Sequence, residues 1–269
     1  IFYKYFNRKI NFSERILKFL IKKKFNIVGV VTRKKSTNHD FKDLSTICKK
    51  NGIPCKYKTN INNKEIKEWL KKIKVDLIIC LGWNEIISKD IFNLPKISSI
   101  GYHPAKLPQN RGKHPVIWSL VLGLKTTYST FFHLTDKVDS GNIISQEKVL
   151  IKDHYYAKHL YNSLIKKAKS QISRILFNKR YFNRQKKIKI TQSNYWRKRN
   201  YKDGKIDWRM SAENIRNLVR GLSDPYPNAF FTYRKKEYFV KKINIKKSKD
   251  KNIEPGKIIK NHREKKIIK

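Results

Sequence analysis

The sequence predicts an α/β fold, with a doubly wound and mainly parallel sheet followed by a small β-rich domain. Three observations predict it. Helix-period and strand-period segments alternate through the first half of the chain, as they do in parallel sheets with helices on both faces. Residues 75–81 (VDLIICL) form a continuous apolar run, which is typical of a strand buried on both faces. After residue 200, one amphipathic pattern is followed by short strand patterns and turns, which indicates a second, β-rich unit.

Periodicity and end signals place the elements of the first half. Ser13 is a suitable N-cap for a helix, because its hydroxyl can accept a free backbone N–H. Another helix is expected to end at Asn51-Gly52, since both residues tolerate the left-handed conformation that follows many helix C-termini. In order, the expected elements are helix 13–21, strand 26–32, helix 41–50, a short strand after Pro54, helix 61–73, strand 75–81 and strand 98–103.

Apolar spacing predicts the second half in the same way. In order, the expected elements are helix 115–122, strands 127–134 and 143–151, helix 155–177, a charged linker over 179–199, a helix capped by Ser211, a hairpin of 229–233 and 238–245, and a strand over 257–260. The loss of apolar periodicity in the linker marks a boundary. We therefore predict one domain over residues 1–190 and a second over 191–269.

The charge of the chain permits two interpretations. Lys+Arg number 64 against 20 Asp+Glu, a formal net charge of +44. A basic excess is the electrostatic footprint expected of a nucleic-acid binder. The lysines, however, are spread along the whole sequence among abundant Ile, Asn, Phe and Tyr, which favours a solvated lysine-rich surface. Hydrophobic residues make up 39% of the chain, enough to exclude wholesale disorder.

Targeting and redox signals are few. No apolar run approaches the roughly 18 residues of a membrane span, and no charged and then apolar segment opens the chain as a secretory signal would. The three cysteines, Cys48, Cys55 and Cys80, are odd in number and lack CxxC spacing, which argues against a disulfide framework and a zinc site. We therefore expect a cytoplasmic protein with no metal and no membrane partner. Because the chain starts at Ile1, we also expect it to be a fragment.

A polar and rigid loop follows the strand expected over 98–103. Residues 101–112 (GYHPAKLPQNRG) hold two prolines and two glycines around His103 and Arg111. Ligands of doubly wound sheets bind beyond the carboxyl ends of the strands, that is, just after Leu81 and just after Ile100. A loop of this composition at that edge favours a functional site over a simple connection.

This loop and the residues after it resemble a known family. The similarity lies in HPAKLPQNRG (103–112) and in the residues that follow, namely Pro115, Trp118, Gly123, Thr130 and Asp139-Ser140-Gly141. Together they resemble the N10-formyltetrahydrofolate-dependent formyltransferases, which include methionyl-tRNA and sugar-nucleotide enzymes. DGKIDW (203–208) and PYP (225–227) resemble the start of the second domain of these enzymes. The resemblance implies a Rossmann-like first domain and an OB-like barrel, expected here to be incomplete and, with open strand edges, marginally stable or disordered.

The resemblance also implies an activity and the residues that carry it. The activity is transfer of a formyl group from N10-formyltetrahydrofolate, as co-substrate, to a primary amine. Such a reaction needs a stabiliser for the oxyanion and an acceptor for the proton of the amine. His103 and Asp139 match the catalytic His and Asp of the family, so we expect His103 to stabilise the oxyanion and Asp139 to accept the proton through water. Leu81, Gly82 and Trp83 resemble the wall of the pterin pocket, where Asp139 is also expected.

One position departs from the pattern of the family. The usual Asn two positions before the catalytic His is Gly101 in this chain. Loss of one oxyanion donor typically slows comparable reactions about 10²–10³-fold, unless Tyr102, a backbone amide, a water or a substrate group replaces it. Tyr102 is accordingly one candidate substrate-binding residue. Arg111 is another, through its planar guanidinium, with a salt bridge that pins the loop as the alternative.

The sequence permits three interpretations of the function. NRGKHPVIW (110–118) resembles the sugar enzymes more than the tRNA enzymes, which favours a nucleotide-linked amino sugar as the substrate. The first alternative is methionyl-tRNA formylation, in which the second domain and the basic surface would contact phosphates of initiator tRNA. The second alternative is an inactive relative that only binds folate or nucleic acid, and Gly101 motivates it.

Overall fold

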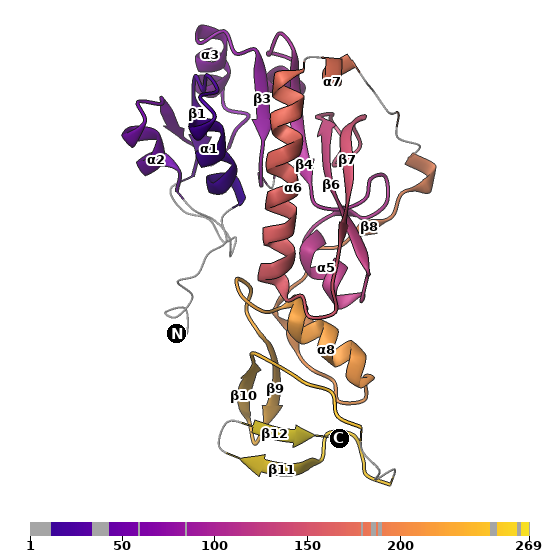
Figure 1. Ribbon diagram of the computed structural model, residues 1–269. Coiled ribbons are helices and arrows are strands. Elements are labelled where there is room, and N and C mark those ends of the chain that lie inside the picture. The colour runs from indigo at the N-terminus through magenta and orange to yellow at the C-terminus, as the bar shows by residue number, and fades with distance from the viewer. Residues whose placement is uncertain are drawn as a thin grey trace.

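A long helix and a central sheet organise the molecule. The computed structural model describes residues 12–33, 43–58, 60–83, 85–178, 180–183, 187, 190–247, 252–262 and 265–268. Helix α6 (Ala157–Phe177) runs along the sheet, and the second domain lies beyond the N-terminal end of this helix (Figure 1). The described residues that follow α6 pass alongside the sheet before the second domain begins (Figure 1).

The first half of the chain follows the expected alternation of helices and strands. Its elements are α1 (Phe12–Lys22), β1 (Val30–Thr32), α2 (Ser45–Lys50), β2 (Cys55–Tyr57), α3 (Lys64–Lys72), β3 (Leu77–Cys80), α4 (Lys89–Phe92) and β4 (Ser98–His103). The helix expected over 41–50 begins at Ser45, and residues 41 and 42 lie outside the described ranges. The strand expected over 26–32 is shorter. Helix α4 is one turn long, too short to show a helical period in the sequence.

The second half adds the elements around the loop and the second domain. They are β5 (Arg111–Gly112), α5 (Pro115–Val121), β6 (Thr126–His133), β7 (Ile143–Leu150), α6, α7 (Arg180–Asn183), η1 (Ile190–Gln192), β8 (Tyr195–Trp196), η2 (Tyr201–Gly204), α8 (Ala212–Gly221), β9 (Ala229–Tyr233), β10 (Lys236–Val240), β11 (Ile258–His262) and β12 (Lys265–Ile268). The expected linker, 179–199, thus contains α7, η1 and β8, while 179, 184–186 and 188–189 lie outside the described residues. Ser211 caps α8 as predicted, its hydroxyl accepting the N–H of Asn214.

The sheet topology is mixed. The central sheet has the strand order β3-β4-β6-β7, and β1 and β2 form a separate parallel pair. Strands β3 and β4 are parallel, whereas β6 is antiparallel to both β4 and β7. The short connection between β6 and β7 leaves no room for a crossover helix, so these two strands form a hairpin. The Rossmann-like fold is therefore confirmed, with a mixed sheet in place of a mainly parallel one.

At β4, one face of the sheet packs in the core and the other faces the loop that follows the strand. Residues directly opposite each other in an antiparallel pair lie on the same face, so Tyr102 shares a face with its partner Phe131. Tyr102 stacks on Phe12 of α1 at 4.4 Å between ring centroids, and α6 packs against α1, β6 and β7. This face is the core. Residues Gly101 and His103 point to the other face, which is covered by the loop that follows β4.

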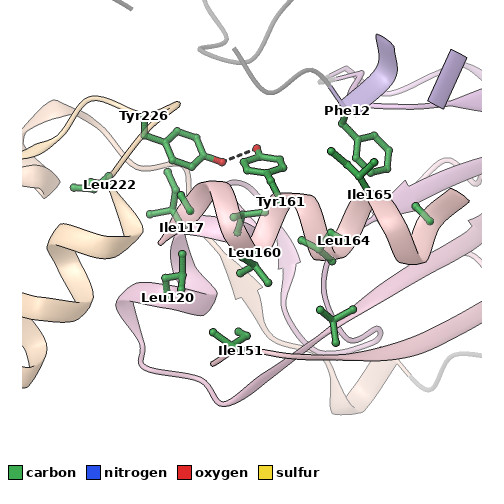
Figure 2. Packing of buried hydrophobic residues seen from close by; sticks show 14 of the residues in the cluster. Phe12, Ile117, Leu120, Ile151, Leu160, Tyr161, Leu164, Ile165, Leu222 and Tyr226 are labelled. Carbon is green, nitrogen blue, oxygen red and sulfur yellow. Dashed lines mark hydrogen bonds between the residues drawn. The ribbon is translucent and has the colours of Figure 1, made fainter. Parts of the chain in front are cut away.

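The core is continuous between the two domains. Helix α5 packs against α8 of the second domain, and Leu120 and Leu222 belong to one buried apolar cluster. The hydroxyls of Tyr161 on α6 and Tyr226 in the second domain are 2.6 Å apart and hydrogen-bonded, as Figure 2 shows. The second domain is thus docked through buried side chains rather than tethered by a linker.

The second domain consists of α8 and two hairpins in the part that the structure describes. Strands β9 and β10 form one antiparallel pair, and β11 and β12 form another. Lys205 bridges Phe230 of β9 in the parallel sense, which attaches the chain after η2 to the first hairpin. The domain is β-rich as expected, and the prediction that its barrel is incomplete stays a prediction.

An ion pair secures the chain where it enters the second domain. Both carboxylate oxygens of Asp203 accept hydrogen bonds from the guanidinium of Arg197, which lowers the pKa of Asp203 to about 2. Because this folded-state value lies below the unfolded value, the pair stabilises the fold above pH 4 and the effect is lost as the pH falls towards 2. With Arg197 58% exposed, solvent reduces the contribution to about 1 kcal/mol.

We expect Asp203→Asn to lower the free energy of unfolding by about 1 kcal/mol at pH 7, with the difference shrinking below pH 4. Urea denaturation at a series of pH values measures it. Asp136→Asn is the matched control, because Asp136 pairs with Lys89 only at 3.6 Å and between exposed side chains, and should change little. Equal losses in both variants would show that the Asp203 pair has no special weight.

Candidate active site

His103 is the last residue of β4 and is only 4% exposed. It lies opposite Thr130 of β6, on the sheet face away from the core. Its Nε2 is 2.7 Å from the backbone oxygen of Asn110. A carbonyl oxygen can only accept, so Nε2 carries the proton in this contact. The imidazole is therefore fixed at Nε2 by the loop that covers it, and Nδ1 takes no part in this bond.

Asp139 approaches the free side of that imidazole from the connection between β6 and β7. Its Oδ2 is 3.5 Å from Nδ1 of His103 and accepts the N–H of Gly112 at 3.1 Å. Its backbone has φ 47°, a left-handed conformation that Asp and Asn tolerate better than most residues. A proton added at Nδ1 would lie between imidazole and carboxylate. The structure thus brings together the two predicted catalytic side chains, which come from different segments of the chain.

Three side chains of the sheet fasten the loop 104–108 over the site. Thr127 donates to the oxygen of Pro104 at 3.1 Å and Thr130 to that of Ala105 at 2.7 Å. Gln146 of β7 donates to the oxygen of Leu107 at 3.0 Å. These bonds satisfy backbone carbonyls that the proline-rich loop cannot pair within itself. Thr130 therefore holds the loop in place, in addition to its position in a strand.

Arg111 also holds the site together. Its Nε donates to the oxygen of Val138 at 2.9 Å, and its Nη2 donates to the same oxygen. The residue next to this carbonyl is Asp139, so the guanidinium ties the loop after β4 to the loop that carries the carboxylate. The predicted alternative of a loop-pinning role thus has a contact, although the acceptor is a carbonyl rather than a carboxylate. Substrate binding by Arg111 stays a prediction.

Residues 81–83 leave the sheet beside the catalytic pair. Cys80 pairs with Gly101 in parallel register, so the chain after Cys80 emerges at the same edge as His103. Burial, with a smaller contribution from the charge of Asp139, raises the pKa of the Cys80 thiol to about 12. Gly82 has φ 69°, and the oxygen of Leu81 accepts the hydroxyl of Ser13 at 2.8 Å. This geometry fits a backbone rim beside the site.

Among residues 81–83, only Trp83 has a polar side-chain atom, and this atom lacks a hydrogen-bond partner among the described residues. It is the indole Nε1, and it is buried. The guanidinium of Arg33 lies 4.5 Å from the centroid of the ring. Because a buried N–H without an acceptor is costly, this donor fits a ligand with hydrogen-bond acceptors at the rim, as the pterin pocket of the resemblance would require.

Comparison with known proteins decides the family. The formyl transferase family model matches residues 6–176, and the model for the formyl transferase C-terminal domain matches residues 198–269. The chain belongs to the formyl transferase family. The resemblance found in the sequence is therefore confirmed, while the boundary placed at residue 190 stays a prediction.

Two curated relatives and one solved structure show how similar the chain is to individual members of this family. The chain is 38% identical over 239 residues to the bifunctional polymyxin resistance protein ArnA of Wigglesworthia glossinidia brevipalpis, covering 86% of this chain and 35% of ArnA. It is 32% identical over 201 residues to methionyl-tRNA formyltransferase of Clostridium perfringens, covering 74% and 64% of the two chains. The chain thus spans less than two thirds of these relatives. The N-formyltransferase of Helicobacter canadensis, solved with folinic acid and dTDP-3-aminofucose, shares the fold with a TM-score of 0.63 and 20% identity over 84% of this chain and 82% of its own.

The structure explains why this member of the formyl transferase family has Gly101. A Cβ on Gly101 would lie 2.7 Å from Cζ of Phe132 and 2.9 Å from Cδ2 of Leu134. The ring of Phe132 is 4% exposed and packs with Leu107 and Ile143 beneath the loop. The space that an Asn side chain would need is therefore filled by an apolar cluster.

Tyr102 does not lie in the site. It faces the core between Phe12 and Phe131, and its hydroxyl accepts the hydroxyl of Ser129 at 3.1 Å. Burial raises the pKa of this phenol. The prediction that Tyr102 replaces the missing donor is therefore wrong, because adjacent residues of a strand point to opposite faces. A strand over 98–103 by itself implies this alternation.

Other features of the described residues place limits on the site. Two surface cavities, one of about 470 Å³ lined in part by Lys49 and Tyr57, lie around α2, and neither is lined by His103 or Asp139. No group of three His, Cys, Asp or Glu side chains is arranged for a metal ion within the described ranges. None of the described helices is both long and apolar enough to cross a bilayer.

Asn110 is a residue of the site that the sequence does not predict, because the contact with His103 is made by its backbone carbonyl and not by its side chain.

Proposed function

We propose that this protein transfers a formyl group from N10-formyltetrahydrofolate to the primary amine of a nucleotide-linked amino sugar. The observation that carries the proposal is the contact between His103 and Asp139, with Nδ1 and Oδ2 3.5 Å apart and both side chains largely buried. Membership of the formyl transferase family supports the reaction class. We also propose that the reaction takes place in the cytoplasm.

Each group of the pair has a separate task. The Nε2 proton of His103, held at rest by the carbonyl of Asn110, is the donor available to an oxygen that gains negative charge. Nδ1 and the carboxylate of Asp139 together form an acceptor for the proton that the amine loses. Gly112 keeps the carboxylate in position through its N–H. One imidazole and one carboxylate thus supply the oxyanion donor and the base.

Residues 81–83 would hold the co-substrate. When bound, N10-formyltetrahydrofolate supplies the formyl group. The indole N–H of Trp83 is available to an acceptor on a heterocycle, and the positive φ of Gly82 keeps the backbone open at that point. The charge of Asp139 also acts on Cys80, the residue just before this rim, which supports its assignment to the co-substrate site as well as to catalysis.

The choice of acceptor rests on similarity. The N-formyltransferase of Helicobacter canadensis, which shares this fold, was solved with a dTDP-amino sugar, and the motif 110–118 resembles the sugar enzymes. Methionyl-tRNA formylation is the second candidate, since relatives more than 30% identical carry that name and the net charge of +44 would favour binding to phosphates.

Two acceptor assays separate these candidates. Consumption of N10-formyltetrahydrofolate is measured with a panel of UDP- and dTDP-amino sugars, and separately with initiator methionyl-tRNA. We expect turnover with an amino sugar and only weak, sequence-independent tRNA binding that disappears with added salt. Turnover of initiator methionyl-tRNA would overturn the sugar assignment. In that case we expect specific tRNA binding whose affinity falls steeply with salt but stays measurable. Binding of folate without turnover of any acceptor would indicate the inactive relative.

A further inference from the structure

The segment that leads into the second domain is bonded to the loop that holds the catalytic pair. Strand β8 runs parallel to β5, with Tyr195 opposite Arg111. The N–H of Arg111 donates to the oxygen of Asn194 at 3.2 Å, and the N–H of Lys113 donates to that of Trp196 at 2.9 Å. The side-chain Oδ1 of Asn194 accepts the N–H of Asn110 at 2.7 Å. Three loop amides thus depend on residues 194–196.

The same loop amides alternate in direction, as they do in any extended strand. While Arg111 and Lys113 donate towards β8, the N–H of Gly112 points the other way and donates to Asp139. The peptide unit between Asn110 and Arg111 is bonded at both ends. Its oxygen accepts the N–H of His103 Nε2, and its N–H, that of Arg111, donates to the backbone oxygen of Asn194. The orientation of this one peptide plane therefore sets where the imidazole finds its acceptor.

Two features adapt the chain to this close contact. A Cβ on Gly112, which has φ 100°, would collide with the oxygen of Trp196 and lie 2.8 Å from the ring of Tyr195, so only glycine lets the two segments approach. Asn110 has φ 62°, a conformation that a bond to its N–H helps to fix. The segment is in turn anchored beyond β8, where the indole of Trp118 donates to the oxygen of Arg197 at 3.0 Å.

We propose that Asn194 is a positioning residue for His103. The inference rests on the proposed function, because it assumes that His103 and Asp139 act in formyl transfer. Asn194 acts through the backbone of Asn110: its Oδ1 accepts the N–H of Asn110 and its backbone oxygen accepts the N–H of Arg111, so its side chain helps to fix the residue whose oxygen holds Nε2 of His103. It touches no reacting atom. The segment 194–196 thereby makes the geometry of the catalytic pair depend on the chain that enters the second domain, outside both the 103–112 motif and the residues matched by the first family model.

The test compares Asn194→Ala with Asn194→Asp. The alanine variant loses the Oδ1 acceptor, whereas aspartate keeps an acceptor oxygen at the same place. We expect alanine to lower kcat about 2- to 10-fold with KM for N10-formyltetrahydrofolate unchanged, to alter the pH profile of kcat, and to shift the ¹⁵N resonance of His103 Nε2. Aspartate should restore all three towards the wild-type values.

Asn178→Ala is the matched control, because Oδ1 of Asn178 accepts the backbone N–H of Arg180 at the far end of α6, the same type of bond away from the site. Thermal unfolding of each variant monitors the fold. If Asn194→Ala lowers kcat no more than Asn178→Ala does, or leaves the His103 resonance in place, the positioning role is wrong. If the wild-type protein itself shows no turnover, the proposed function fails, and the His103 resonance still decides the positioning role independently.

Discussion

Replacing His103 by alanine is expected to lower the rate of formyl transfer about 10²–10⁴-fold, the range typical of a lost acid–base group. The variant removes both the Nε2 donor and the Nδ1 site that faces Asp139. Release of formyl from N10-formyltetrahydrofolate in the presence of the amine acceptor measures the effect. His133→Ala is the control, because His133 lies in the neighbouring strand β6 and bonds to Ser98 rather than to the loop.

Asp139→Asn tests the other half of the pair. Asparagine tolerates the left-handed backbone at this position and can still accept the N–H of Gly112 through its oxygen, but its amide cannot take up a proton. We expect a loss of about 10²-fold or more with little change in folding. Asp136→Asn controls for charge in the same connection, because Asp136 is exposed and pairs with Lys89. Equal formyl release by wild type, His103→Ala and Asp139→Asn would instead favour the inactive relative.

Restoring the asparagine of the family at position 101 is expected to fail. The Cβ of Gly101→Asn would meet Phe132 and Leu134 at 2.7 and 2.9 Å, and overpacking of this kind costs about 1–3 kcal/mol. Urea denaturation should show that loss, and the rate of formyl transfer should fall rather than rise. The substitution alone therefore adds an amide where there is no room to hold it.

The double variant Gly101→Asn with Phe132→Val separates space from chemistry. Valine suits a strand and removes the ring, the nearer of the two side chains that a Cβ at position 101 would meet, which leaves only the end of Leu134 to shift. Relative to Phe132→Val alone, the double variant is expected to be about 10-fold or more faster, since one oxyanion donor is worth about 10²–10³ in comparable sites. A Gly101→Asn protein as stable as wild type would disprove the steric explanation. An unchanged rate in the double variant would mean that the site does not use a donor from this position.

The parts of the fold that the sequence predicts are those with strong local signals. Strand β4 is expected over 98–103 and spans those residues, and the Ser211 cap places the start of α8. By contrast, β5 and β8 are two residues long and depend on pairing between distant segments. A two-residue strand has no period, and its partner lies in a stretch that the sequence shows only as charged linker.

The site shows the same division. His103 and Asp139 were identified from a motif, which names residues but not their contacts, and the structure supplies the 3.5 Å between them. The carbonyl of Asn110 and the oxygens of Asn194 are backbone or tertiary features without a residue signature. Tyr102 lies next to His103 in the motif, but the alternation of the strand turns its side chain to the core. The ring of Phe132 against Gly101 is a pairing across two strands, which one sequence cannot reveal.

The buried cluster that the two domains share around Ile117 and Leu222 has a consequence for the evolution of the protein. Helix α5 follows directly on the 103–112 motif and rests on α8, so a defect in the small domain is transmitted to the residues that surround the imidazole. Inherited changes that disturb the contact between α5 and α8 are therefore expected to reduce turnover as well as abundance. Natural variants of the two domains should be compatible mainly with the partner domain alongside which they evolved.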